Sequence, residues 1–187
     1  INIMKILILS HTRCGSTTLC KWLEKELGIE LDETPYNKIT FNSVFKKESI
    51  IRKIVVEEYF PTKEEIDGFD KIIFLIRNNN IDAAISYTIA NNLDEWHKEY
   101  RVTNEWIENN EIEIINISNY IRELKNRIKD YIGFHITYED LYINKNSVNK
   151  ILDYMSIESP EHLYMLGYDR KYRKDDNLFI KKYIGLI

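Results

Sequence analysis

Residues 6–23, ILILSHTRCGSTTLCKWL, constrain the fold more than any other part of the chain. The run of Ile and Leu predicts a strand over Met4 to Leu9 that is buried on both faces, as in a parallel sheet. From Ser16 to Leu27 the apolar residues recur at helical spacing, and Gly28 is a suitable stop. The segment therefore predicts a strand, a polar loop and a helix.

The remaining chain continues to alternate between strands and helices. Alternation of this kind predicts an α/β fold, a three-layer α/β/α sandwich with a mainly parallel central sheet. At 187 residues the chain suits one domain, spanning residues 1–187. The predicted strands are 50–60, 71–76 and 134–137; the predicted helices are 62–68, with Thr62 and Glu65 as a capping box, 81–93, 105–132 and 147–155.

Composition and charge exclude several classes of protein. Hydrophobic residues make up 44% and charged residues 30% of the chain, which is ordinary for a globular protein and argues against disorder. The net charge of -4 does not suit a nucleic-acid binder that relies on a basic field. Cys14 and Cys20 are expected to be reduced thiols. No apolar run approaches the roughly 20 residues that a membrane helix needs, so we expect no membrane insertion and a cytoplasmic location.

The polar loop after the first strand has the chemistry of an anion site. Ligands of open parallel sheets bind beyond the carboxyl ends of the strands, where this loop is expected. A helix that begins near Gly15 or Ser16 would point free N–H groups and a positive dipole end at that place. Thr17 and Thr18 add hydroxyl donors, and Arg13 adds a guanidinium suited to a tetrahedral oxyanion. On the loop alone, a simple helix cap with a solvated Arg13 is an equal alternative.

The loop differs from the most familiar phosphate-binding loop. The pattern GxxxxGK[ST] needs a first glycine and a Gly-Lys pair, and this chain has neither. An ATP or GTP site that uses magnesium is therefore disfavoured.

Three segments, in this order, resemble the sulfotransferases that use 3'-phosphoadenosine 5'-phosphosulfate (PAPS). HTRCGSTTL, residues 11–19, is similar to their 5'-phosphosulfate loop. KIIFLIRNNNIDAAISY, residues 71–87, is similar to the strand, arginine and helix that bind the 3'-phosphate. FHITYEDLY, residues 134–142, is similar to a later strand with its YEDL segment. The resemblance implies a P-loop-like sulfotransferase fold, with PAPS as co-substrate and a small-molecule hydroxyl acceptor as partner.

The resemblance also implies which residues bind the nucleotide. Arg77 and Ser86 would bind the 3'-phosphate, and a basic stretch near the C-terminus would fold over it, with a solvated face as the alternative for that stretch. The phosphosulfate loop comprises Arg13, Cys14, Gly15, Ser16, Thr17 and Thr18, and the basic stretch comprises Arg170, Lys171, Arg173 and Lys174.

Details of the second segment are closer to the bacterial branch that sulfates trehalose and related carbohydrates. The interval from Arg77 to Ser86 is one residue longer than in common cytosolic animal enzymes. In the bacterial branch a glutamate next to a proline is the general base, and Glu33, displaced by one residue from that register, is the nearest match. The resemblance therefore favours a carbohydrate or glycolipid acceptor.

The implied reaction is an in-line transfer of the sulfuryl group, in which Arg13 and the helix N-terminus stabilise charge. Glu33 is the first choice for the base that takes the acceptor proton, with a solvated loop carboxylate as an equal alternative. His11 and His97 are reserves, although a hydrogen-bonding role suits His11 better. Tyr138, Glu139 and Asp140 are expected to serve structure, the carboxylates by capping a turn or orienting loops.

Two other functions stay open. A non-catalytic module could bind PAPS or adenosine 3',5'-bisphosphate (PAP) with a degenerate acceptor site. A P-loop phosphotransferase is the third hypothesis, which the missing Gly-Lys pair disfavours. The spacing of His and carboxylate residues suggests no metal site. Neither the acceptor nor the oligomeric state is readable from the sequence.

Overall fold

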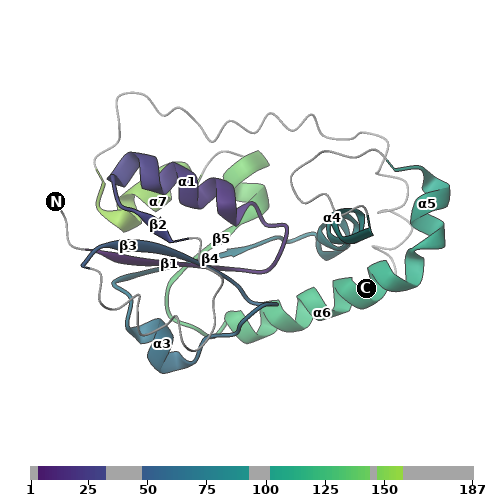
Figure 1. The fold of residues 1–187 in the computed structure, drawn as a ribbon, viewed down its shortest axis with the longest axis horizontal. Helices are drawn as coiled ribbons and strands as arrows, with labels where there is room; N and C mark the ends of the chain where they lie inside the picture. The colour runs from purple at the N-terminus through teal and green to yellow at the C-terminus, as the bar shows by residue number, and fades with distance from the viewer. Residues whose placement is uncertain (1–3, 33–47, 93–101, 144–146, 158–187) are drawn as a thin grey trace. The chain divides into compact units, whose positions relative to one another are not determined.

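A computed structural model describes residues 4–32, 48–92, 102–143 and 147–157. These residues form two compact units (Figure 1). The first unit holds the described residues up to Asn78 and from Leu124 onward, and the second holds those from Asn79 to Glu123. That the whole chain forms one domain stays a prediction.

A five-stranded sheet, with every strand pair parallel, is the centre of the first unit. The strand order is β2-β3-β1-β4-β5. Ser10, at the end of β1, pairs with Val55 on one side and with Leu75 on the other, so the carboxyl ends of three neighbouring strands lie at one edge. The strands are β1 (Lys5–Ser10), β2 (Leu31–Asp32), β3 (Ile50–Val55), β4 (Lys71–Ile76) and β5 (Phe134–Thr137).

Helices cover both faces of this sheet. The helices α1 (Ser16–Leu27) and α7 (Val148–Met155) pack on one face, and α3 (Lys63–Asp67) packs on the other with the end of α6 (Glu111–Ile128). Figure 1 shows α1 and α7 above the sheet and α3 below it. The predicted three-layer sandwich with a parallel sheet is therefore confirmed.

The side chains of β1 explain why the first strand reads as a continuous apolar run. Ile6 and Ile8 join the core under α1 and α7, whereas Leu7 and Leu9 join the core under α3. All four are fully buried. Strands covered on both faces need apolar residues at successive positions rather than at alternate ones.

Helix α1 follows its sequence pattern closely. Leu19, Trp22 and Leu23 are buried against the sheet. The helix ends as predicted at Gly28, which adopts the left-handed conformation at φ 64° and donates its N–H to the Glu24 carbonyl. A glycine is favoured there because other residues enter that conformation at a cost.

The second unit is helical. It holds α4 (Asn80–Asn92), α5 (Asn104–Asn109) and α6 as far as Glu123. Its apolar core is formed by Ile81, Ala83, Ala84, Ile85, Ile89, Ile107, Ile114 and Ile121.

Several elements differ from the sequence-based expectation. The strand predicted over 50–60 ends at Val55, because the chain turns there and Glu58 donates its N–H to the Val55 carbonyl. The helix predicted over 105–132 is two helices separated at Asn110, whose side-chain amide donates to the Trp106 carbonyl at 2.7 Å. Strand β2 was not predicted, since two residues are too few for a pattern.

The predicted capping box at the start of α3 is confirmed. Thr62 Oγ1 accepts a hydrogen bond from the Glu65 N–H, and a Glu65 carboxylate oxygen accepts one from the Thr62 N–H. The two residues satisfy each other's backbone donors, which starts the helix. The same Glu65 carboxylate accepts from the Tyr59 hydroxyl.

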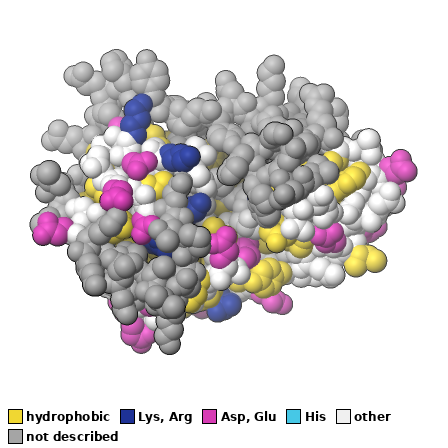
Figure 2. All heavy atoms as spheres, viewed as in Figure 1, with side chains coloured by type: hydrophobic (Ala, Val, Ile, Leu, Met, Phe, Trp, Pro, Cys, Tyr) yellow, Lys and Arg dark blue, Asp and Glu magenta, His cyan; other side chains and the backbone are white. Residues whose placement is uncertain are grey.

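The described parts of the chain contain no helix that combines enough length and apolar character to cross a membrane. On the face drawn in Figure 2, the acidic and basic side chains of the described residues are interspersed.

A buried ion pair joins the two strands at one side of the sheet. Arg52 on β3 is fully buried, and its Nη1 lies 2.9 Å from Oδ2 of Asp32 on β2. The two residues are also register partners in the parallel pair. A guanidinium removed from water is stable in the core only when such partners compensate its charge.

Replacing Asp32 should therefore destabilise the fold. We expect Asp32→Ala to lower the free energy of unfolding by about 3 kcal/mol, because it removes a carboxylate that compensates the charge of a buried guanidinium. Asp153→Ala removes an exposed carboxylate from α7 and should change stability by less than about 0.5 kcal/mol. Urea denaturation measures both values. Equal changes in the free energy of unfolding for the two variants would show that the buried ion pair does not stabilise the fold more than an exposed carboxylate does.

Candidate functional site

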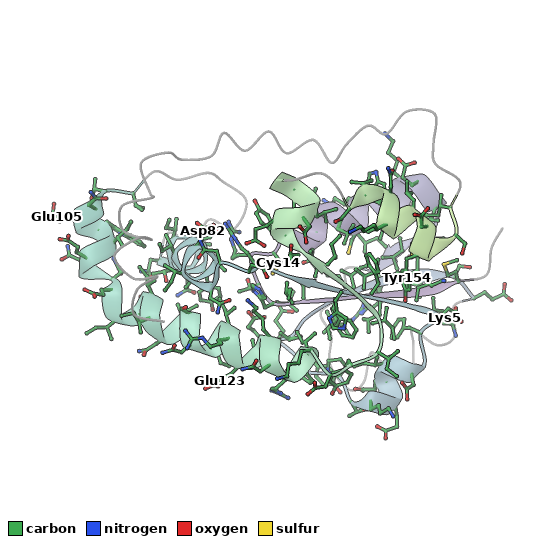
Figure 3. All side chains as sticks on the ribbon, turned by 180° about the vertical axis from the view of Figure 1, so that it is seen from behind. Lys5, Cys14, Asp82, Glu105, Glu123 and Tyr154 are labelled. Carbon is green, nitrogen blue, oxygen red and sulfur yellow. The ribbon has the colours of Figure 1, made fainter. Side chains whose placement is uncertain are left out.

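The loops that follow four parallel strands meet at one edge of the sheet. His11 to Gly15 follow β1, Glu57 follows β3, Arg77 and Asn78 follow β4, and Tyr138 and Glu139 follow β5. In Figure 3 Cys14 lies at this end of the sheet, away from Lys5 and Tyr154 at the opposite end. Ligands of open parallel sheets bind at this edge, which makes it the candidate site.

The loop after β1 leaves the start of α1 without a side-chain cap. Gly15 occupies the N-cap position at φ 79° and has no side chain to accept from the helix N–H groups. The N-termini of α3 and α5, in contrast, are each capped by a threonine side chain. The first-turn N–H groups have no acceptor within the helix, and the dipole is positive there, so this end suits an anion.

Tyr142 packs directly against Gly15. Its hydroxyl donates to the Gly15 carbonyl at 2.6 Å. A Cβ atom added at position 15 would lie 2.7 Å from Tyr142 Cε2, closer than real contacts allow. Glycine is therefore required twice over at this position, by the left-handed backbone and by the tyrosine ring.

Lys53 brings a positive charge to the same helix end, and the sequence analysis did not identify it. It lies on β3, and its Nζ donates to Thr17 Oγ1 in the first turn of α1 at 3.0 Å. The signal was available in the sequence, because a lysine inside a strand that is otherwise largely apolar is unusual.

Arg77 lies against the loop after β1. Its Nη1 donates to the Arg13 carbonyl at 3.4 Å, and its guanidinium lies 4.5 Å from the centre of the Tyr138 ring. The Arg77 carbonyl accepts from Lys125 Nζ at 2.9 Å. Arg77 and the loop after β1 therefore form one cluster within the first unit. Ser86, the other predicted 3'-phosphate ligand, lies on α4 in the second unit and is partly buried.

The carboxylates of the YEDL segment serve structure, as expected. Glu139 Oε2 accepts from the Asn78 N–H at 2.9 Å and so orients the loop after β4. Asp140 is linked to Thr137, whose hydroxyl donates to Asp140 Oδ2 at 2.8 Å and accepts from the Asp140 N–H. The contact of Glu139 confirms that a carboxylate of this segment orients a neighbouring loop, whereas the turn at Asp140 is capped by the Thr137 hydroxyl and not by a carboxylate.

His11 is completely buried and uses both ring nitrogens. Nδ1 lies 2.8 Å from the Thr12 carbonyl oxygen, and Nε2 accepts from the Arg77 N–H at 3.0 Å. Burial lowers the pKa of His11 to about 4, and the charges of Lys125 and Arg77 act in the same direction. This geometry favours the hydrogen-bonding role over that of a base.

Glu57 is a stronger candidate for a base, and the sequence analysis missed it. Its Oε1 accepts from the Thr12 N–H in the loop after β1 at 2.8 Å. Burial raises the pKa of Glu57 to about 7, although the bond from Thr12 opposes the shift. A carboxylate of this pKa can take up a proton near neutral pH. It was missed because the predicted strand ran to Phe60 and hid Glu57, which in fact lies in the turn after β3.

Cys14 is a buried thiol with no sign of activation. Its Sγ donates to the Thr12 carbonyl at 3.9 Å, and burial raises the pKa of Cys14 well above its usual range. A protonated thiol is a poor nucleophile, so the redox role that a helix N-terminus can confer is disfavoured. Cys20 is likewise buried and free.

Several predicted site residues lie outside the described residues and stay predictions. They are Glu33, His97, Arg170, Lys171, Arg173 and Lys174. Among the residues that are described, no three His, Cys, Asp or Glu side chains gather in a way that could hold a metal ion.

Comparison with known proteins identifies the fold. No protein-family model matches the sequence, and a search of curated proteins finds no match. Mouse sulfotransferase SULT7A1 complexed with PAP aligns over 86% of this chain and 61% of its own length, at 16% identity and a TM-score of 0.58. The chain shares the fold of sulfotransferases.

A second solved structure also has this fold. The sulfotransferase domain from the curacin biosynthetic pathway aligns over 90% of this chain and 78% of its own length, at 12% identity and a TM-score of 0.50. Identities this low establish the fold and nothing finer. The chain also spans less than two thirds of the mouse enzyme.

The two left-handed glycines allow the contact with Tyr142 to be measured. Gly28→Ala introduces backbone strain into open space, since no atom lies within 4 Å of the added Cβ, and should cost about 1 to 2 kcal/mol. Gly15→Ala adds the clash with the tyrosine ring and should cost at least about 1 kcal/mol more. Urea denaturation of both variants gives the difference. A cost at Gly15 no larger than at Gly28 would contradict a fixed Tyr142 ring.

Proposed function

We propose that this chain is a sulfotransferase that moves the sulfuryl group of PAPS to a hydroxyl of a small acceptor. One observation carries the proposal. The uncapped N-terminus of α1 and the guanidinium of Arg77, two groups suited to oxyanions, belong to one cluster, with Arg77 Nη1 3.4 Å from the Arg13 carbonyl. A nucleotide with anionic groups at its 5' and 3' positions suits such a pair.

The residues present fit PAPS. The first-turn N–H groups of α1, the hydroxyls of Ser16, Thr17 and Thr18, and the Lys53 ammonium would hold the 5'-phosphosulfate. The resemblance assigns the 3'-phosphate to Arg77 and Ser86, and the basic stretch with Arg170, Lys171 and Arg173 to the same end. The mouse sulfotransferase of similar fold was solved in complex with PAP, which is what remains of PAPS after the sulfuryl group has been transferred. This supports the choice of PAPS as co-substrate.

The reaction would exchange one sulfur–oxygen bond for another. The acceptor hydroxyl oxygen forms a bond to sulfur while the bond between sulfur and the 5'-phosphate oxygen breaks, which leaves PAP and a sulfate ester. The leaving oxygen gains negative charge, and the helix dipole with Lys53 and Arg13 would stabilise it. We propose that no metal takes part.

We propose that Glu57 accepts the proton of the acceptor hydroxyl. It contacts the loop that would hold the phosphosulfate, and its pKa of about 7 suits a base at neutral pH. Glu33 remains the alternative from the resemblance. His11 is less suited, because both of its nitrogens already have backbone partners.

The acceptor class follows from the sequence resemblance to the bacterial trehalose and carbohydrate branch. We therefore favour a carbohydrate or glycolipid hydroxyl and a cytoplasmic setting.

Two experimental outcomes would replace this function with another. Tight binding of PAP without transfer to any acceptor indicates a non-catalytic module, and stabilisation by ATP with magnesium indicates a phosphotransferase.

Nucleotide selectivity tests the proposal directly. At a concentration 100 times its Kd, PAP should stabilise the fold by about 2.7 kcal/mol, seen as a rise in melting temperature, and AMP or ATP with magnesium should do less at the same concentration. Arg77→Met should abolish the difference between PAP and AMP. Arg127→Met is the matched control, since the Arg127 guanidinium also lies over an aromatic ring, that of Phe60, at 3.7 Å.

The Arg127→Met variant should keep the full preference for PAP. A wild-type protein that AMP stabilises as well as PAP does would overturn the proposed function.

The pH dependence of transfer tests Glu57. Because a base acts in its deprotonated form, kcat/KM should rise with pH through about 7 and then level off. Glu57→Gln keeps an oxygen for the Thr12 N–H and should lower kcat by about 10² to 10⁴-fold while PAP still raises the melting temperature. Glu58→Gln, at the exposed neighbouring position, should retain activity. Full activity in Glu57→Gln would return the role to Glu33.

A further inference from the structure

His11 joins the loop after β1 to the loop after β4. It is fully buried at the end of β1, and its Nε2 accepts from the backbone N–H of Arg77 on the neighbouring strand end at 3.0 Å. Its Nδ1 lies 2.8 Å from the Thr12 carbonyl oxygen. One ring therefore bridges the backbones of the two loops that would hold the two ends of the nucleotide.

The partners decide where the ring carries its proton. A carbonyl oxygen can only accept, so Nδ1 must donate to Thr12. A backbone N–H can only donate, so Nε2 must carry no proton in order to accept from the Arg77 N–H. Both contacts form together only in the neutral ring with its proton on Nδ1, and the lowered pKa of His11 keeps the ring neutral at neutral pH.

Both the backbone and the side chain of Arg77 are held by neighbouring groups. His11 accepts from its N–H, Lys125 donates to its carbonyl at 2.9 Å, and its guanidinium reaches the Arg13 carbonyl at 3.4 Å while it lies on Tyr138. The contact through His11 ties the Arg77 backbone to the loop after β1, and the guanidinium contact ties its side chain to the same loop. Loss of the His11 contact would remove the backbone tie and leave the position of the guanidinium less strictly fixed relative to the loop.

We propose that His11 is a positioning residue that couples the two oxyanion sites, so that a 3',5'-bisphosphate binds more tightly than its two phosphates would separately. The inference rests on the proposed function, because it assigns the 5' end of the ligand to the loop after β1 and the 3' end to Arg77. In this role the His11 ring bridges two backbone groups and takes no proton from the acceptor. It therefore differs from the role of a reserve base.

A pair of variants separates the contact from the mere presence of a polar side chain. In His11→Gln the amide oxygen can reach the place of Nε2 and accept from the Arg77 N–H. In His11→Asn the shorter amide reaches only the place of Nδ1, so the contact with Arg77 is lost. Both variants replace the ring by an amide and so disturb the core in similar ways. His135→Gln, at an exposed position on β5, is the control.

The measurement is the ratio of the Kd for AMP to the Kd for PAP, obtained by calorimetry at neutral pH. We expect His11→Asn to lower this ratio by about tenfold or more, a typical size for coupling between sites. His11→Gln should keep most of the ratio, and His135→Gln should keep all of it. Equal weakening of both ligands in His11→Asn, which a purely structural role predicts, would overturn the inference.

The outcomes distinguish this inference from the proposed function. If the wild-type protein does not prefer PAP to AMP, the proposed function fails, and the inference fails with it. If the wild type has the preference and His11→Asn retains it, only the inference fails.

A measurement on the unmodified protein covers the case in which the variants do not fold. Long-range ¹H–¹⁵N spectra should show His11 with a proton on Nδ1 and none on Nε2, and addition of PAP should shift the Nε2 signal more than addition of AMP does. A proton on Nε2, or equal shifts with both ligands, would overturn the inference.

Discussion

Parallel pairing of β1 with both β3 and β4 is the constraint on which the site depends. Because Ser10 is in register with Val55 and with Leu75, the chain leaves all three strands at the same edge of the sheet. The loops that follow carry His11 to Gly15, Glu57 and Arg77. These residues are far apart in the sequence and meet only because an apolar strand, buried on both faces, aligns its neighbours.

The electrostatics of the cluster also follow from this arrangement. Lys53, Lys125 and Arg77 bring positive charge to a small volume of a chain whose net charge is -4. Backbone carbonyls and the Tyr138 ring contact these cations and partly compensate that charge. Burial keeps His11 neutral and raises the pKa of Glu57, so neither group carries its full charge near neutral pH. Such a local positive set attracts an anion without a general basic surface.

The segment after β5 supports the loops after β1 and β4, although it lies far from both in the sequence. Tyr138 lies under the Arg77 guanidinium, and Tyr142, four residues later, donates to the Gly15 carbonyl. Their ring centres are 5.0 Å apart, as expected for residues one turn apart in a helical segment. Tyr138, directly before the π-helix Glu139–Ile143, and Tyr142 within it thus contact two different loops. These contacts give the YEDLY segment a structural role beside the loops after β1 and β4.

Local patterns in the sequence were enough to predict most of the strands and helices, and they indicated an anion site in the loop after β1, which stays a prediction. The apolar run before His11 predicted a strand covered on both faces, and Gly28 and the Thr62 capping box marked helix ends correctly, because each depends on neighbours in the chain. The cluster of Arg13, Gly15 and hydroxyl residues indicated an anion site for the same reason. What only the tertiary structure decided is which side chains from other strands reach that loop. Lys53, Glu57 and the bond from Arg77 to His11 join residues 36 to 66 positions apart, and such contacts depend on strand order and register, which local periodicity does not encode.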